Sequence, residues 1–186
     1  SDRGELQLTD YGISGIPVFQ VSRYASEALD RKKRVLAVLD FFPSLKDEEL
    51  FLLLKEQRMY LSDRKAEGFL NGIFHKKLAA LFLKAAGIRG EEMTGRLSDK
   101  KLLAAAELIK RTVVEVTAAN SFDKAQVCMG GVRVKDVDPC TMESRLVPGL
   151  YFAGEILDVD GICGGYNLQW AGSSGYAAGA SATGKE

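Results

Sequence analysis

Histidine and cysteine are scarce in this sequence of 186 residues. There is one histidine, His75, and there are three cysteines, Cys128, Cys140 and Cys163. No two cysteines stand in a CxxC pair, so neither a zinc site of the usual spacing nor a disulfide framework is predicted. Unpaired cysteines are typical of a reducing compartment, and we therefore expect a cytoplasmic protein without a metal.

An excess of charge of one sign is also missing. The sequence has 25 Lys and Arg against 25 Asp and Glu. Proteins that bind nucleic acid or an anionic membrane through basic surfaces carry an excess of Lys and Arg. We expect neither partner here. With 46% apolar and 27% charged residues, the composition excludes an intrinsically disordered chain.

No long apolar run is present. The first residues are polar and resemble no signal peptide. Residues 161–184 contain no charged side chain, but seven glycines and several polar residues make this stretch too polar for an ordinary spanning helix.

The patterns that are present predict an α+β fold, with a mainly helical middle and flanking strands that pair into a mixed sheet. Ser14 and Ser44 are expected to cap the first two helices, with Asp47 completing a capping box, and Ser98 the fourth. The helices are expected at 15–29, 44–59, 69–86, 99–109 and 167–182, and the strands at 5–9, 35–39, 112–117, 126–129, 132–134 and 150–153. A change of composition near residue 119 is the predicted domain boundary.

Glycine is concentrated at the C-terminal end, where 11 of the 19 glycines lie between 130 and 184. Gly164 and Gly165 precede a helix and allow close approach of a ligand to the backbone. The free N–H groups of that helix, over 166–169, suit an electron-rich group. Glu155, at the end of an expected strand, is placed to accept hydrogen bonds from sugar-type hydroxyls. The alternative is a glycine-rich connection that only closes a sheet.

The segments 130–132, 141–161 and 164–169 together resemble the C-terminal signature of the bacterial YhiN/BaiN-like flavoproteins, an aminoacetone-oxidase-like family of NAD(P)/FAD-dependent oxidoreductases. Residues 4–15 resemble the inserted domain of the same family. The resemblance implies an inserted substrate or cap domain over 1–118 and the C-terminal portion of a Rossmann-like FAD-binding domain over 119–186. Cys128, where the family often has Thr, and Gly172, where a larger residue is often seen, depart from the pattern.

The resemblance also implies FAD as cofactor, with NAD(P)H as the electron donor and a small molecule as substrate. Glu155 would face the ribityl or phosphate region, and the helix start would lie beside the pyrimidine edge of the isoalloxazine ring. The implied cofactor-binding residues are Gly154, Glu155, Asp160, Gly161, Gly164, Gly165, Tyr166, Asn167 and Gln169. No catalytic side chain is predicted.

The sequence lacks one further feature, a GxGxxG fingerprint after a strand. In the family this fingerprint lies at the N-terminus of a protein about twice as long. We therefore expect a fragment of a FAD-dependent oxidoreductase, inactive by itself, whose partner is the missing N-terminal FAD domain or a second copy of the chain. The alternatives are a non-enzymatic insert or docking module without cofactor and a glycine-rich end that binds another nucleotide alone.

Overall fold

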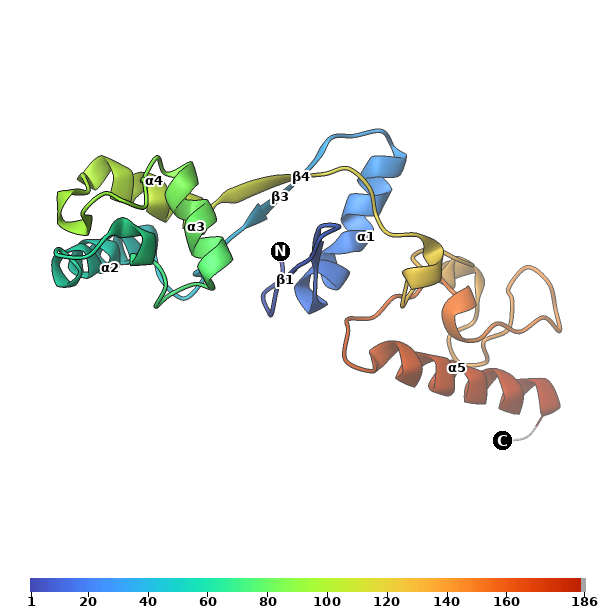
Figure 1. Cartoon of the computed structure of the whole chain (residues 1–186). Coiled ribbons are helices and arrows are strands. Elements are labelled where there is room, and N and C mark those ends of the chain that lie inside the picture. Colours follow the sequence, from blue (N-terminus) through green and yellow to red (C-terminus); the bar gives the residue numbers. More distant parts are fainter. Residues whose placement is uncertain (185–186) are drawn as a thin grey trace. The chain divides into compact units, whose positions relative to one another are not determined.

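The computed structural model describes residues 1–184, which divide into two compact units. The first, here called the helical unit, is Leu36–Val116, and the second, the split unit, joins Ser1–Val35 to Thr117–Glu186. Figure 1 shows the elements of both in chain order. The predicted boundary near residue 119 stays a prediction.

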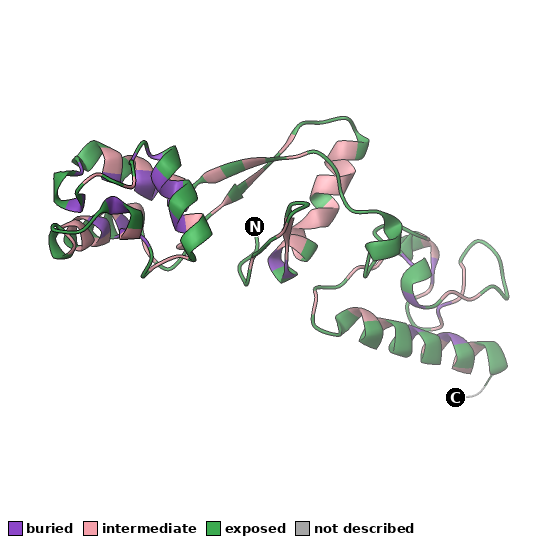
Figure 2. Cartoon of the chain, in the orientation of Figure 1, coloured by how far each residue is buried: buried purple, intermediate pink, exposed green. Residues whose placement is uncertain are grey.

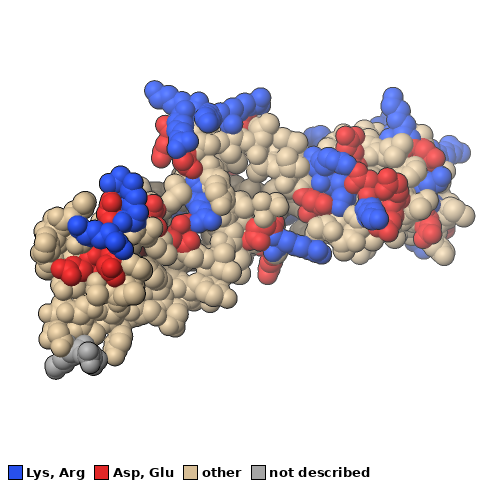
Figure 3. All heavy atoms as spheres, turned by 180° about the vertical axis from the view of Figure 1, so that it is seen from behind, with Lys and Arg blue, Asp and Glu red and all other residues tan. Residues whose placement is uncertain are grey.

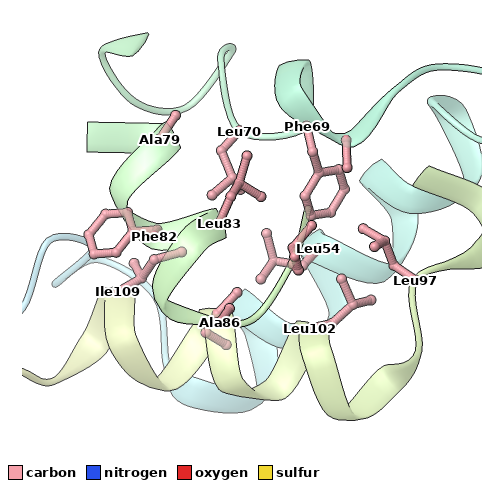
Figure 4. Packing of buried hydrophobic residues seen from close by; sticks show 14 of the residues in the cluster. Leu54, Phe69, Leu70, Ala79, Phe82, Leu83, Ala86, Leu97, Leu102 and Ile109 are labelled. Carbon is pink, nitrogen blue, oxygen red and sulfur yellow. The ribbon is translucent and has the colours of Figure 1, made fainter. Parts of the chain in front are cut away.

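The helical unit packs three helices around one apolar core. These are α2 (Asp47–Tyr60), α3 (Lys76–Ala85) and α4 (Asp99–Lys110). Strand β3 (Val35–Leu39) precedes them and pairs with β4 (Thr112–Val116), which follows them. Fifteen buried apolar residues make up the core, which includes the fully buried Phe82. Figure 4 shows part of this cluster, and the buried positions of Figure 2 are concentrated in these helices.

Aromatic rings close one side of this core. The ring of Phe82 meets those of Phe41 and Phe74 edge to face, with centroids 5.3 and 5.2 Å apart. Such pairs stabilise a core beyond the area that they bury. Most apolar positions of the expected middle helices therefore lie in the core, but Leu81 and Leu103 do not, since they are 56% and 52% exposed.

The helix starts are partly as predicted. Ser98 caps α4, because its hydroxyl accepts a hydrogen bond from the Lys101 N–H at 3.4 Å. The cap at Ser44 is wrong: α2 begins three residues later, and the Lys46 N–H donates to the Glu49 carboxylate at 2.7 Å. The buried Lys110 ammonium donates hydrogen bonds to the carbonyls of Phe42 and Leu45, at 3.0 and 2.7 Å. These bonds hold residues 42–45, just before α2, outside that helix.

The helix expected over 69–86 is wrong in its first half. A 3₁₀ turn at Ala66–Gly68 and further turns precede α3, whose start is capped by the imidazole of His75. Phe69 and Leu70 are fully buried, and the Ala66 N–H donates to the Glu92 carbonyl at 2.8 Å. Tertiary packing therefore overrides helix propensity in this segment.

The N-terminal part of the split unit is a hairpin followed by a helix. Strand β1 (Gln7–Leu8) pairs antiparallel with β2 (Ile13–Ser14), and α1 covers Ile16–Asp30 with Pro17 in its first turn. The expected cap at Ser14 is wrong, because Ser14 pairs with Gln7 in the hairpin.

The C-terminal part of the split unit has a long helix and little strand. Helix α5 (Tyr166–Thr183) is as predicted, but the strands expected at 126–129, 132–134 and 150–153 are wrong. Single bridges stand in their place, a parallel one between Val132 and Leu157 and an antiparallel one between Glu143 and Tyr151. Three 3₁₀ turns interrupt this region, at Phe122–Lys124, Val134–Asp136 and Gly154–Ile156.

The mixture of helices and strands is confirmed, but the mixed sheet is not. Within residues 1–184 the strands form two separate two-stranded sheets. The apolar cluster of the C-terminal part is small, with Val137, Met142, Leu157 and Ala178 buried. No helix in the described part of the chain is long and apolar enough to cross a membrane.

Candidate functional site

Two segments of the split unit run side by side and form the base of the candidate site. The Val132 N–H donates to the Ile156 carbonyl at 2.8 Å, and the Asp158 N–H donates to the Val132 carbonyl at 2.9 Å. Gly131, with φ +147°, precedes this bridge, and a Cβ there would collide with the Ile156 carbonyl oxygen. Segment 130–132 is therefore joined directly to segment 141–161, the second of the three that carry the family resemblance.

Glu155 lies at this junction. Its side chain is exposed, and its Oε1 accepts a hydrogen bond of 2.6 Å from the Cys128 N–H. Among the described residues, no hydrogen bond to its Oε2 is found, so this oxygen can accept one from a ligand hydroxyl. Cys128 thus contributes its backbone to the site, and its thiol is free.

Gly154 is held by helix α5. Its N–H donates to the Ser174 hydroxyl at 2.9 Å, and its carbonyl accepts a hydrogen bond of 3.2 Å from the Trp170 indole. Ser174 is 2% exposed, and its hydroxyl donates to the Trp170 carbonyl at 2.6 Å. Gly154 is therefore a buried structural position, fixed by two residues that the sequence analysis did not select. Their spacing of one helical turn is the only signal that the sequence offered.

The glycine-rich loop is closed by Asn167. The Gly161 N–H donates to the Asn167 side-chain oxygen at 2.7 Å, and the Asn167 amide donates to the Gly161 carbonyl at 3.1 Å. Gly165, with φ +90°, is the N-cap of α5 and has open space around it. Glycine is required here by the positive φ of the backbone, and not by a lack of space for a side chain. A Cβ at Gly164 would lie 3.6 Å from the Tyr166 ring, so the side chains of Tyr166 and Asn167 border the helix start.

The first turn of α5 is accessible. Tyr166 is 59% exposed, and the Gln169 amide donates to the Ser173 hydroxyl at 3.0 Å. The first backbone N–H groups of a helix lack carbonyl partners within it and carry partial positive charge. The arrangement can therefore bind an electron-rich group.

Asp160 contacts a distant segment of the split unit. Its carboxylate forms an ion pair with Arg23 of α1, 137 residues earlier in the chain. The hydrogen bond to Asp160 raises the pKa of Arg23 above its ordinary value. Sequence reasoning missed Arg23, because nothing in the local pattern connects α1 with this loop.

The nine predicted cofactor-binding residues lie between Gly154 and Gln169. Those from 161 to 169 form the loop and first turn of α5, and Gly154 is held by Trp170 and Ser174 further along this helix. Hollows of about 400 Å³, beside Leu61 and Arg64, and about 580 Å³, beside Leu81, lie in the helical unit and contain none of them. In the described residues no cluster of three or more His, Cys, Asp or Glu side chains could hold a metal ion.

The chain belongs to the HI0933-like family, the flavoprotein family that its C-terminal motif resembles. Residues 78–181 match the HI0933-like protein Rossmann domain, and residues 1–127 match the HI0933-like protein barrel and H2TH domain.

Curated relatives in this family are named as enzymes. The chain is 42% identical over 181 residues to a 3-dehydro-bile acid delta(4,6)-reductase of Clostridium scindens. It is 33% and 31% identical over 175 residues to the ribosomal RNA dihydrouridine synthases of Haemophilus influenzae and Escherichia coli. These alignments cover 97%, 93% and 94% of this chain but 44%, 41% and 41% of the relatives. The chain therefore spans less than half the length of the curated relatives that it matches.

Proposed function

We propose that the C-terminal part of this chain supplies one side of the FAD site of a flavin-dependent reductase. The single observation that carries the proposal is the exposed start of α5, which follows Gly164 and Gly165, together with the exposed Glu155 carboxylate in the segment that precedes this loop. This combination fits a dinucleotide cofactor, because a polyol chain offers hydroxyl donors and a flavin ring offers an electron-rich edge.

Each residue then has a role toward the cofactor. The Glu155 carboxylate accepts hydrogen bonds from the ribityl chain, and the N–H groups of 166–168 face the pyrimidine edge of the isoalloxazine ring. The flavin, when bound, supplies two-electron redox chemistry. A helix N-terminus at that edge stabilises negative charge on the reduced ring, which raises the reduction potential.

The other side of the FAD site would come from a nucleotide-binding region outside these 186 residues. Two observations support this proposal. The chain spans 44% of its bile acid reductase relative. Apolar side chains of the C-terminal part also lie open: Leu168 and Tyr176 of α5 are 81% and 77% exposed. Figure 3 shows a broad uncharged area over α5, at the lower left of that view.

The reaction that we propose is reduction of a conjugated carbon–carbon double bond in a small molecule. The names of the relatives denote reduction of delta(4,6) double bonds in one case and of uridine in the other. NAD(P)H would supply two electrons and one proton, and water a second proton, so that the C=C bond becomes CH–CH. Equal numbers of acidic and basic residues favour a small apolar substrate over RNA.

The test uses the protein from the complete reading frame. It is expected to bind FAD and to oxidise NAD(P)H in the presence of a steroid dienone, with no turnover on unmodified ribosomal RNA. Turnover on RNA alone would overturn the substrate class and leave the flavin proposal standing. Absence of flavin from the folded protein would overturn both, and would favour the docking-module alternative.

The role of Glu155 is tested in the same protein by Glu155→Ala and Glu155→Gln. Loss of the carboxylate is expected to weaken FAD binding about tenfold or more, whereas Gln, which keeps an acceptor for Cys128, has a smaller effect. Glu143→Ala is the matched control, since Glu143 also accepts a backbone hydrogen bond, from Gly149 at 2.7 Å. Unchanged FAD affinity in Glu155→Ala would refute the assigned role.

A further inference from the structure

The ion pair between Arg23 and Asp160 joins α1 to the loop that leads into α5. Arg23 Nη1 contacts Asp160 Oδ2 and also lies 3.4 Å from the Asp160 carbonyl oxygen. The two side chains are 34% and 24% exposed. The pair is therefore partly shielded from water, where a charge-assisted hydrogen bond is stronger than on an open surface.

The guanidinium of Arg23 is oriented from its other side by Tyr24. Arg23 Nη2 donates a hydrogen bond to the Tyr24 hydroxyl at 3.0 Å, and the guanidinium carbon lies 4.9 Å from the centre of the Tyr24 ring. Buried Nε has no hydrogen-bond partner among the described residues. Arg23 thus carries an unsatisfied donor, which costs free energy, and its contact with Asp160 compensates for part of this cost.

The next residue after Asp160 is held from the opposite direction. Gly161 forms two hydrogen bonds with Asn167 in the first turn of α5. The loop is consequently fixed at adjacent residues, at Asp160 by α1 and at Gly161 by α5. Gly164 and Gly165 follow after two further residues, with positive φ values that glycine adopts without strain.

We propose that Arg23 is a positioning residue for the glycine-rich loop: through Asp160 it fixes the backbone of 161–165 and so sets the place of the α5 N-terminus. Its consequence for the cofactor rests on the proposed function. Its effect on the loop does not, because the loop is held by residues of this chain alone.

Hydrogen exchange of the 186-residue chain tests the loop directly. Arg23→Gln and Asp160→Asn are each expected to speed exchange of the Gly161 amide, which is hydrogen-bonded to Asn167, about tenfold, and the double variant to do no more than either single one. Arg23→Lys, which keeps a donor and the charge, is expected to restore part of the protection. Exchange in α2 and α4 is expected to stay unchanged, because both helices belong to the helical unit.

Arg31→Gln is the matched control, because Arg31 pairs with Glu27 on α1 itself, at 2.6 Å. It is expected to leave the loop as it is. Unchanged exchange of the Gly161 amide in Arg23→Gln, or strictly additive effects in the double variant, would overturn the proposal.

A second readout separates this proposal from the proposed function. In the flavin-loaded protein of the complete reading frame, Arg23→Gln is expected to shift the flavin absorption spectrum and weaken FAD binding, and Arg23→Lys to restore both in part. A faster-exchanging loop with unchanged flavin properties would uphold the role of Arg23 in the loop and count against the flavin site. An unchanged loop would count against Arg23 whatever the flavin does.

Discussion

The helical unit and the C-terminal part of the split unit differ in how completely they bury their apolar side chains. The helical unit encloses fifteen buried apolar residues around Phe69 and Phe82. The cluster of the C-terminal part has four, while Leu168 and Tyr176 on α5 lie open to solvent. Since burial of apolar area is the main favourable term in folding, the helical unit has its own source of stability. The C-terminal part depends more on backbone geometry and on hydrogen bonds.

The largest effect on the free energy of unfolding is expected from a substitution in the core of the helical unit. Phe82→Ala removes a fully buried ring and is expected to lower the free energy of unfolding by about 3–5 kcal/mol, measured by denaturant titration of this unit. Leu81→Ala is the control on the same helix, since Leu81 is 56% exposed. It is expected to change stability by less than about 0.5 kcal/mol. Equal effects of the two substitutions would contradict this account of the core.

The next effect tests whether the C-terminal part depends on glycine geometry. Gly131→Ala places a Cβ against the Ile156 carbonyl at positive φ and is expected to cost about 2–3 kcal/mol. Gly149→Ala is the control for conformation alone, because Gly149 also has positive φ but open space. Hydrogen exchange of the Val132 and Asp158 amides would follow the loss. If both amides stayed fully protected from exchange in Gly131→Ala, the expected loss of stability would be contradicted.

A smaller and opposite effect is expected on the open face of α5. A Cβ at Gly172 would meet nothing within 4 Å in the described structure. Gly172→Ala is therefore expected to stabilise α5 in this chain by about 0.5–1 kcal/mol, measured by its thermal unfolding followed by circular dichroism. Loss of that gain in the protein from the complete reading frame would indicate a partner packed on this face. Destabilisation of the 186-residue chain itself would contradict the open face.

The smallest effect is a pH dependence within the helical unit. Hydrogen bonding from Lys101 and Arg89 lowers the pKa of Glu92 from 4.5 to about 2. A lowered folded-state pKa contributes stability above pH 4.5 that is lost as the pH falls toward 2. Glu92→Gln is expected to weaken the dependence of the unfolding midpoint on pH in this window. Glu91→Gln, at an exposed position, is the control, and an equal effect there would count against the assignment.

The helices were predictable and the connections were not. Ser98 and α5 follow local rules, a hydroxyl cap in one case and glycines before a long helix in the other, and both are confirmed. The conformations of Ser44 and of residues 69–74 are instead determined by tertiary contacts, which are the hydrogen bonds of Lys110 and the burial of Phe69. The strands expected in the C-terminal part were wrong because alternation identifies a segment that can pair, and not whether a neighbour is present to pair with it.

The candidate site shows the same division. The sequence pattern selected the stretch from Gly154 to Gln169, and its role in binding a cofactor stays a prediction. In the structure residues 161–169 form the loop and first turn of α5, whereas Gly154 is held by Trp170 and Ser174 further along the helix. The contacts that hold it come from Arg23, Trp170 and Ser174, and no motif connects Arg23 with the loop. The residues that position this stretch could therefore be identified only from the fold.

The most direct test of the central claim is the flavin content of the protein from the complete reading frame, compared with that of the 186-residue chain. We predict a yellow protein with about one FAD per chain in the first case and a colourless one in the second. A folded, full-length protein without flavin would contradict the proposed function, and stoichiometric FAD on the 186-residue chain would contradict the proposal that another region completes the site.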